Sequence, residues 1–113
     1  KVSFTLLLSN NKKTKKLNKD FRNKNRTTDI LSFPFDEKSK ISKKNYLGDI
    51  IISFNFVDRP RSQNLKIFKD KLIRIFIHGF LHLLNFDHKK NKDYKIMLKE
   101  EDFIYQSVIS KLN

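Results

Sequence analysis

Apolar positions divide the chain into two kinds of segment. Three short runs rich in β-branched and aromatic residues, at 2–8, 30–33 and 49–54, predict strands. The third run is apolar at almost every position, which predicts a strand buried on both faces of a sheet. We expect Gly48 to interrupt the chain just before this strand.

Two longer segments in the second half repeat apolar residues at helical spacing. Residues 65–84 predict one helix, and a second is expected to start near residue 92 or 93 and run to about 112. A shorter basic helix is predicted at 12–21, and a side chain of the segment Ser9-Asn10-Asn11 is expected to cap its start. The strands precede the long helices, so we predict a single α+β domain over residues 1–113. Its small, mixed and mostly parallel sheet would be packed with helices.

The charge of the chain points to polyanionic partners. Lys and Arg number 25 against 12 Asp and Glu, which gives a net charge of +13 over 113 residues. Such a field attracts nucleic acid first and anionic membrane surfaces second. No apolar run reaches the roughly 18 residues of a membrane span, so we expect no membrane partner. The absence of cysteine excludes disulfides and thiolate metal sites.

All three histidines of the chain fall in one stretch, "HGFLHLLNFDH", at residues 78–88. His78 and His82 are four residues apart, which places them on one face of the predicted helix, where two imidazoles can chelate one metal ion. A straight helix cannot bring His88 to the same ion. We therefore expect a turn at Asn85, because Asn tolerates the left-handed conformation that ends helices.

Three imidazoles and a water molecule form the ligand set of a catalytic zinc site, so one zinc ion per chain is predicted at the end of the penultimate helix. Copper, nickel and iron also accept imidazole ligands. The same histidine spacing occurs in metzincin proteases, whose general base is a Glu directly after the first histidine. Here that position is Gly79, which disfavours a peptidase.

The histidine stretch resembles the signature H-G-x-L-H-L-x-G-Y-D-H of the YbeY family of zinc-dependent bacterial endoribonucleases, which mature ribosomal RNA. It departs from that signature at Asn85 and Phe86. Further similarity lies in "LNKDFRNKNRTTDILSFPF", in "LGDIIIS", and in Met97 and Glu101. Family members usually have another strand and helix ahead of Val2, so we expect this chain to be truncated or to be a shortened member.

The resemblance implies His78, His82 and His88 as zinc ligands and places Arg22 in the RNA cleft near the metal. There Arg22 could hold a phosphate and stabilise the charge that develops on phosphorus. The implied activity is single-strand-specific cleavage of ribosomal RNA at the 3′ end of the small-subunit RNA, together with ribosome quality control. Either water or a ribose 2′-hydroxyl could be the nucleophile.

Two carboxylates are candidates to support the metal ligands. Asp87 could accept the N–H of a ligand histidine or cap the segment that follows. Glu101 falls within the apolar stripe of the last helix, where a carboxylate without a partner is costly. It could contact a histidine or Arg22, or it could reach water from the edge of that stripe.

Four further basic residues are candidates for contacts with the RNA backbone: Arg59, Arg61, Lys89 and Lys90. The expected partners are ribosomal RNA, the small ribosomal subunit and ribosome-assembly proteins, with no small-molecule cofactor. The resemblance implies the bacterial cytoplasm, or an organelle if the chain is a processed eukaryotic member. An alternative function is a non-catalytic ribosome-assembly factor whose zinc is structural.

Overall fold

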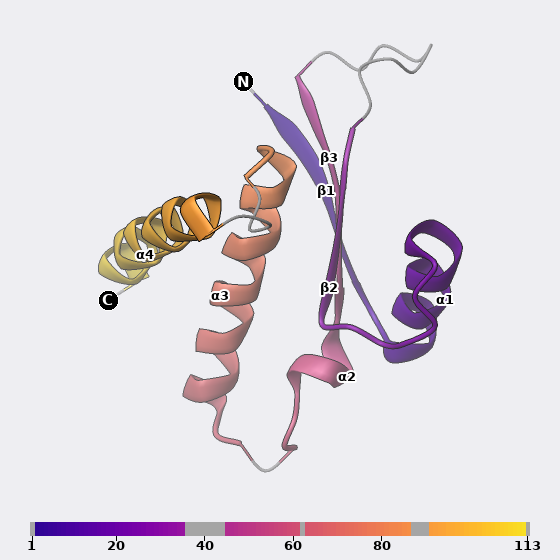
Figure 1. Cartoon of the computed structure of the whole chain (residues 1–113). Helices are drawn as coiled ribbons and strands as arrows, with labels where there is room; N and C mark the ends of the chain where they lie inside the picture. The colour runs from indigo at the N-terminus through magenta and orange to yellow at the C-terminus, as the bar shows by residue number, and fades with distance from the viewer. Residues whose placement is uncertain (1, 36–44, 62, 87–90, 113) are drawn as a thin grey trace.

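The computed structural model describes residues 2–35, 45–61, 63–86 and 91–112, and it has the predicted α+β class (Figure 1). Three strands and four helices follow one another along these residues: β1 (Ser3–Ser9), α1 (Asn11–Arg22), β2 (Ile30–Pro34), β3 (Tyr46–Ser53), α2 (Phe54–Val57), α3 (Leu65–Leu83) and α4 (Asn91–Leu112). The three predicted strands and three predicted helices are all present. The four-residue helix α2 was not predicted, and it takes Phe54 out of the third strand.

The sheet has the order β1-β3-β2, with β3 in the centre. β1 runs parallel to β3, whereas β2 runs antiparallel to it, with Ser32 opposite Ile50. The sheet is therefore mixed, as predicted, and neither orientation predominates among the described strands. Helix α1 covers one face of the sheet, α3 covers the other, and α4 packs on α3 (Figure 1).

The central strand β3 is buried from Ile50 to Ser53, as its apolar run predicted. Gly48, in contrast, does not interrupt the chain before the strand but lies inside it, so that prediction was wrong. Its φ of 136° is a conformation that side chains disfavour, and a Cβ atom there would lie 2.2 Å from the carbonyl oxygen of Phe33. Glycine is thus needed for close pairing with β2 rather than for a break.

Side-chain caps set the start of two helices. The side chain of Asn10 accepts the N–H of Lys13 at 2.9 Å, and the side chain of Asn64 accepts the N–H of Ile67 at 2.9 Å. Two clusters of buried side chains hold α3 in place. One joins it to β3 and α2 through Ile50, Ile52, Val57 and Leu83, and the other joins it to α4 through Ile77, Leu81 and Met97. None of the described helices is long and apolar enough to cross a membrane.

Candidate functional site

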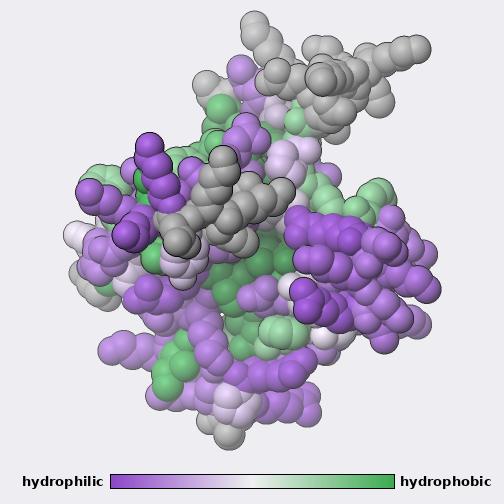
Figure 2. Space-filling view, in the orientation of Figure 1, coloured by the Kyte–Doolittle hydropathy of each residue, from purple (hydrophilic) through white to green (hydrophobic). Residues whose placement is uncertain are grey.

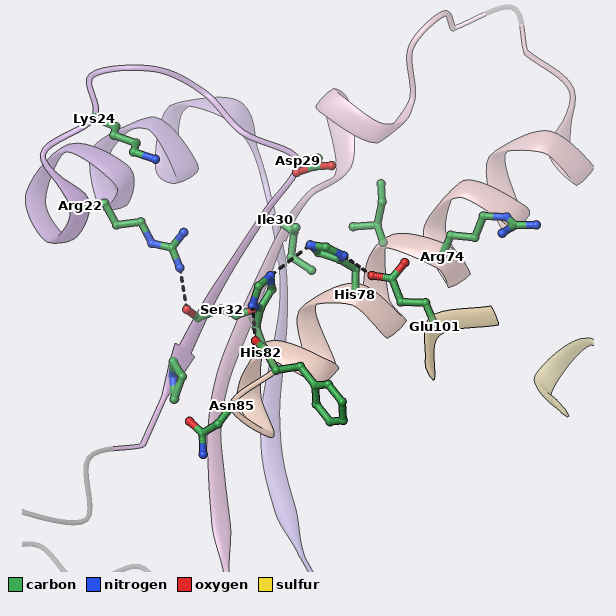
Figure 3. Close-up of a pocket in the computed structure, with 13 residues that line it drawn as sticks. Arg22, Lys24, Asp29, Ile30, Ser32, Arg74, His78, His82, Asn85 and Glu101 are labelled. Carbon is green, nitrogen blue, oxygen red and sulfur yellow. Dashed lines mark hydrogen bonds and ion pairs between the residues drawn. The ribbon is translucent and has the colours of Figure 1, made fainter. Parts of the chain in front are cut away.

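A cavity of about 870 Å³ separates β2 and the end of α1 from the second half of α3. Figure 2 shows hydrophobic surface in the middle of this side of the molecule, flanked by hydrophilic side chains. The side chains of His78 and His82 line the cavity (Figure 3). Among the residues that the structure describes, the other charged or hydroxyl-bearing ones that line it are Arg22, Lys24, Asp29, Ser32, Arg74 and Glu101.

The two imidazoles face each other across one turn of α3. Their Nε2 atoms are 3.1 Å apart. The Nδ1 of His82 hydrogen-bonds the carbonyl oxygen of Phe86 at 3.0 Å, and the Nδ1 of His78 hydrogen-bonds the carboxylate of Glu101. Both partners are acceptors, so each Nδ1 carries the ring proton and each Nε2 of a neutral imidazole keeps its lone pair. Two lone pairs are thereby directed at the same small space.

This arrangement fits a zinc ion. Two nitrogen ligands at about 2.0–2.1 Å from zinc in a tetrahedral set lie about 3.3 Å from each other, close to the separation of the two Nε2 atoms. The contacts to Phe86 and Glu101 are of the kind that orients metal-binding imidazoles. The third predicted ligand, His88, and the candidate Asp87 lie outside the described residues, so the complete ligand set stays a prediction.

The turn expected at Asn85 is present. Asn85 has a φ of 69°, and its N–H donates to the carbonyl oxygen of His82 at 3.0 Å. The N–H of Phe86 donates to the carbonyl oxygen of Leu81 at 3.0 Å, which completes a Schellman motif. This turn also supplies the Phe86 carbonyl that orients His82, so one motif both ends the helix and fixes an imidazole.

Glu101 comes from α4 and lies against His78, one of the contacts that its position in the sequence left open. The carboxylate contacts the imidazole rather than Arg22, and its side chain is only 25% exposed. It also ties α4 to α3 beside the cavity (Figure 3). Its effect on metal retention or on activity stays a prediction.

Arg22 lies on the wall opposite the histidines, at the end of α1. Its Nη2 donates to the carbonyl oxygen of Ser32 at 2.8 Å, and its guanidinium lies 5.6 Å from the centre of the Phe33 ring. One strand thus holds the arginine at the edge of the cavity (Figure 3). The structure therefore brings Arg22 and the histidine pair to one cavity, although Arg22 and His78 are 56 positions apart in the sequence.

Ser32 and Gly79 join the two walls, a role that the sequence did not suggest. The buried Oγ of Ser32 donates to the carbonyl oxygen of Gly79 at 3.0 Å. A Cβ atom at Gly79 would lie 2.4 Å from Cδ1 of Ile30 and 2.9 Å from Oγ of Ser32. Gly79 therefore permits the close approach of α3 to β2. A glutamate at this position would collide with Ile30 and Ser32. The sequence feature that could have pointed to this role is that Ser32 is the single hydroxyl-bearing residue of an apolar strand.

Two of the four remaining predicted basic residues, Arg59 and Arg61, are described by the structure and do not line this cavity. Arg59 and Arg61 are exposed next to α2, where the guanidinium of Arg59 lies 4.5 Å from the centre of the Phe56 ring. Lys89 and Lys90 lie outside the described residues. Lys24 and Arg74, in contrast, line the cavity and were not singled out from the sequence.

Comparisons with known proteins agree on one family. A family model described as "Endoribonuclease YbeY" matches residues 1–109. A protein named "Endoribonuclease YbeY" from Pelagibacter ubique is 58% identical over 112 residues, which cover 99% of this chain and 73% of the relative. One with the same name from Sulfurihydrogenibium sp. is 35% identical, covering 98% and 73%. The solution structure of TM1509 from Thermotoga maritima superposes with a TM-score of 0.62 at 27% identity, covering 99% of this chain and 71% of that one.

Proposed function

The chain belongs to the endoribonuclease YbeY family, and from that premise we propose that it cleaves single-stranded RNA in the cavity between β2 and α3. The observation that carries the proposal is the pair of facing imidazoles, whose protons are fixed on Nδ1, on the wall opposite an anchored arginine. Imidazole nitrogens suit a metal ion, and a guanidinium suits a phosphate. Together they describe a site for a phosphodiester.

His78, His82 and His88 would hold a zinc ion, one per chain. When bound, zinc supplies Lewis acidity, which stabilises negative charge on phosphate oxygens and lowers the pKa of a water molecule. The residues around it act on the ligands themselves. Glu101 and the Phe86 carbonyl keep both Nδ1 protons in place, so the rings do not need to change tautomer before a metal binds.

Arg22 would bind the phosphate that is to be cleaved. The Ser32 carbonyl accepts one N–H of its guanidinium, which positions the group and leaves other N–H donors for phosphate oxygens. Donors that are already in position cost little reorganisation when negative charge grows during the reaction. Either a water molecule or the ribose 2′-hydroxyl could then attack the phosphorus.

The substrate that we propose is precursor ribosomal RNA, with cleavage near the 3′ end of the small-subunit RNA and a part in ribosome quality control. The partners would be the small ribosomal subunit and its assembly proteins, in the bacterial cytoplasm. Family membership and a net charge of +13 support this proposal, because a basic surface binds RNA through its phosphates.

The proposal is tested by measuring RNA cleavage and zinc content for the same preparations. We expect Arg22→Gln to retain zinc and to cleave single-stranded RNA about a hundredfold more slowly, because a donor to the developing charge is lost. His82→Ala should lose both zinc and cleavage. Arg26→Gln is the matched control, because Arg26 is exposed and does not line the cavity.

Three outcomes separate the alternatives. Cleavage by the wild type that depends on Arg22 supports the nuclease. Wild-type protein that holds zinc and binds RNA without cutting it would instead identify the non-catalytic assembly factor. Cleavage that is unchanged in His82→Ala would rule out the proposed metal site, provided that circular dichroism shows a folded variant.

A further inference from the structure

We propose that Arg74 forms a second phosphate-binding position, one or two nucleotides along the RNA strand from the bond that is cleaved. The inference rests on the proposed nuclease function and deepens it, because it assigns the path of the substrate along α3. Arg74 lines the same cavity as the two histidines. Nothing in the sequence motifs pointed to it.

The spacing of three side chains along α3 matches the spacing of phosphates along an RNA strand. Arg74, His78 and His82 follow one another at intervals of four residues, so they lie in a row on one face of the helix. Each interval advances about 6 Å along the helix axis. Successive phosphates are about 3.4 Å apart along the axis of a stacked strand and further apart in an extended one. A strand that has one phosphate at the histidines would thus bring a neighbouring phosphate to Arg74.

The guanidinium of Arg74 is held in place by two other side chains. Its Nε donates to Oδ2 of Asp70 at 3.0 Å, and its Cζ lies over the Tyr105 ring, 3.7 Å from the ring centre. The hydroxyl of Tyr105 donates to the other oxygen of Asp70. An arginine fixed by stacking and by an ion pair loses less conformational freedom when it binds a phosphate.

The fixed guanidinium still has donors to offer. Its hydrogen bond to Asp70 uses the Nε, and the side chain is 56% exposed. Its two Nη groups can therefore donate side by side to two oxygens of one phosphate. The hydrogen bond from Tyr105 lowers the pKa of Asp70, and the hydrogen bond to Asp70 raises the pKa of Arg74, so both stay ionised at neutral pH.

The opposite wall gives the strand a second positive border. Arg22 and Lys24 lie there, on the α1 side of the cavity, whereas Arg74 lies on the α3 side (Figure 3). A single strand that enters between these borders meets the histidines in the middle. Arg74 would then contact the strand beyond the scissile phosphate, where it affects binding of longer substrates only.

The experiment compares RNA substrates of different length that share one cleavage site. A minimal substrate carries one nucleotide on each side of the scissile bond, and two others are extended by three nucleotides on the 5′ or the 3′ side. We expect Arg74→Gln to lower kcat/KM about tenfold on one extended substrate and to leave the minimal substrate and the zinc content unchanged. Arg74→Lys should fall between, because it keeps the charge but loses the planar pair of donors.

Lys69→Gln is the matched control, since Lys69 is an exposed cation of α3 that does not line the cavity. If Arg74→Gln equals this control on every substrate while the wild type cleaves, the second phosphate position is overturned and the proposed function stands. An equal loss on the minimal and extended substrates also overturns it, since Arg74 would then act at the scissile bond. If the wild type cleaves no RNA, the proposed function fails and the second position fails with it.

Discussion

At the scale of single residues, the candidate site depends on acceptors that fix where two protons lie. One acceptor is the Phe86 carbonyl, which no side-chain substitution removes, and the other is the carboxylate of Glu101. The difference matters because a carboxylate also adds negative charge next to an imidazole that we propose as a zinc ligand. Glu101 is therefore the part of this arrangement that mutation can test.

Glu101→Gln should weaken zinc binding about 10–100-fold, because the amide is uncharged and can turn its NH₂ group towards Nδ1 of His78. Competition for zinc against a chelator measures the change. Glu100→Gln is the control, since Glu100 is an exposed neighbour on the same helix. Unchanged zinc affinity together with unchanged cleavage would show that Glu101 only joins α4 to α3.

At the scale of elements, the width of the cavity depends on how closely α3 approaches β2. Gly79 lies where a side chain would meet Ile30 and Ser32, and the Oγ of Ser32 bonds the carbonyl of the same glycine. The carbonyl of Ser32 meanwhile accepts the N–H of Arg22. Ser32 of β2 thus bonds both walls of the cavity, α3 through its hydroxyl group and Arg22 through its carbonyl group.

Gly79→Ala should destabilise the protein even though alanine favours helices by about 1 kcal/mol, because overpacking costs about 1–3 kcal/mol. Adding Ile30→Val should restore part of the loss, since it removes the Cδ1 atom that lies 2.4 Å from the new Cβ. Chemical denaturation of both single variants and the double variant measures this coupling. Additive effects of the two substitutions would contradict the close approach.

The sequence predicted the elements better than it predicted the contacts between them. Regular periodicity located α3 and α4, and local chemistry located the turn at Asn85, because both depend on residues near one another in the chain. The positions of Gly48 in a strand and of Arg74 beside Tyr105 depend on segments that only the folded chain brings together. Arg22 was placed near the histidines through family resemblance, not through its own pattern.

At the scale of the whole molecule, positive charge extends well beyond the cavity. The net charge of +13 includes Arg59 and Arg61, which lie near α2 and away from the histidines. Charges at that distance can attract and hold an RNA strand without taking part in the reaction. Affinity and catalysis should therefore respond to different sets of basic residues.

Affinity for single-stranded RNA should fall steeply with salt, with a logarithmic slope of about −0.7 for each phosphate contacted. The double variant Arg59→Gln/Arg61→Gln should make this slope shallower and leave kcat unchanged, because neither residue lines the cavity. Fluorescence anisotropy over a salt titration gives the slope, and single-turnover cleavage gives the rate. Affinity that stays constant between low and physiological salt would contradict a backbone-binding surface.

The histidine pair and the contact between the two walls of the cavity would form at different stages of folding. His78 and His82 are four residues apart within one helix, whereas the hydrogen bond from Ser32 to Gly79 closes a loop of 47 residues. Local contacts form early and at small entropic cost, and contacts that close long loops form late. A chain in which α3 has formed but β2 has not yet docked would already present the imidazoles of His78 and His82, without Arg22 on the opposite wall. If the proposed zinc site is correct, zinc uptake by the nascent or partly unfolded chain would therefore precede its competence to cut RNA.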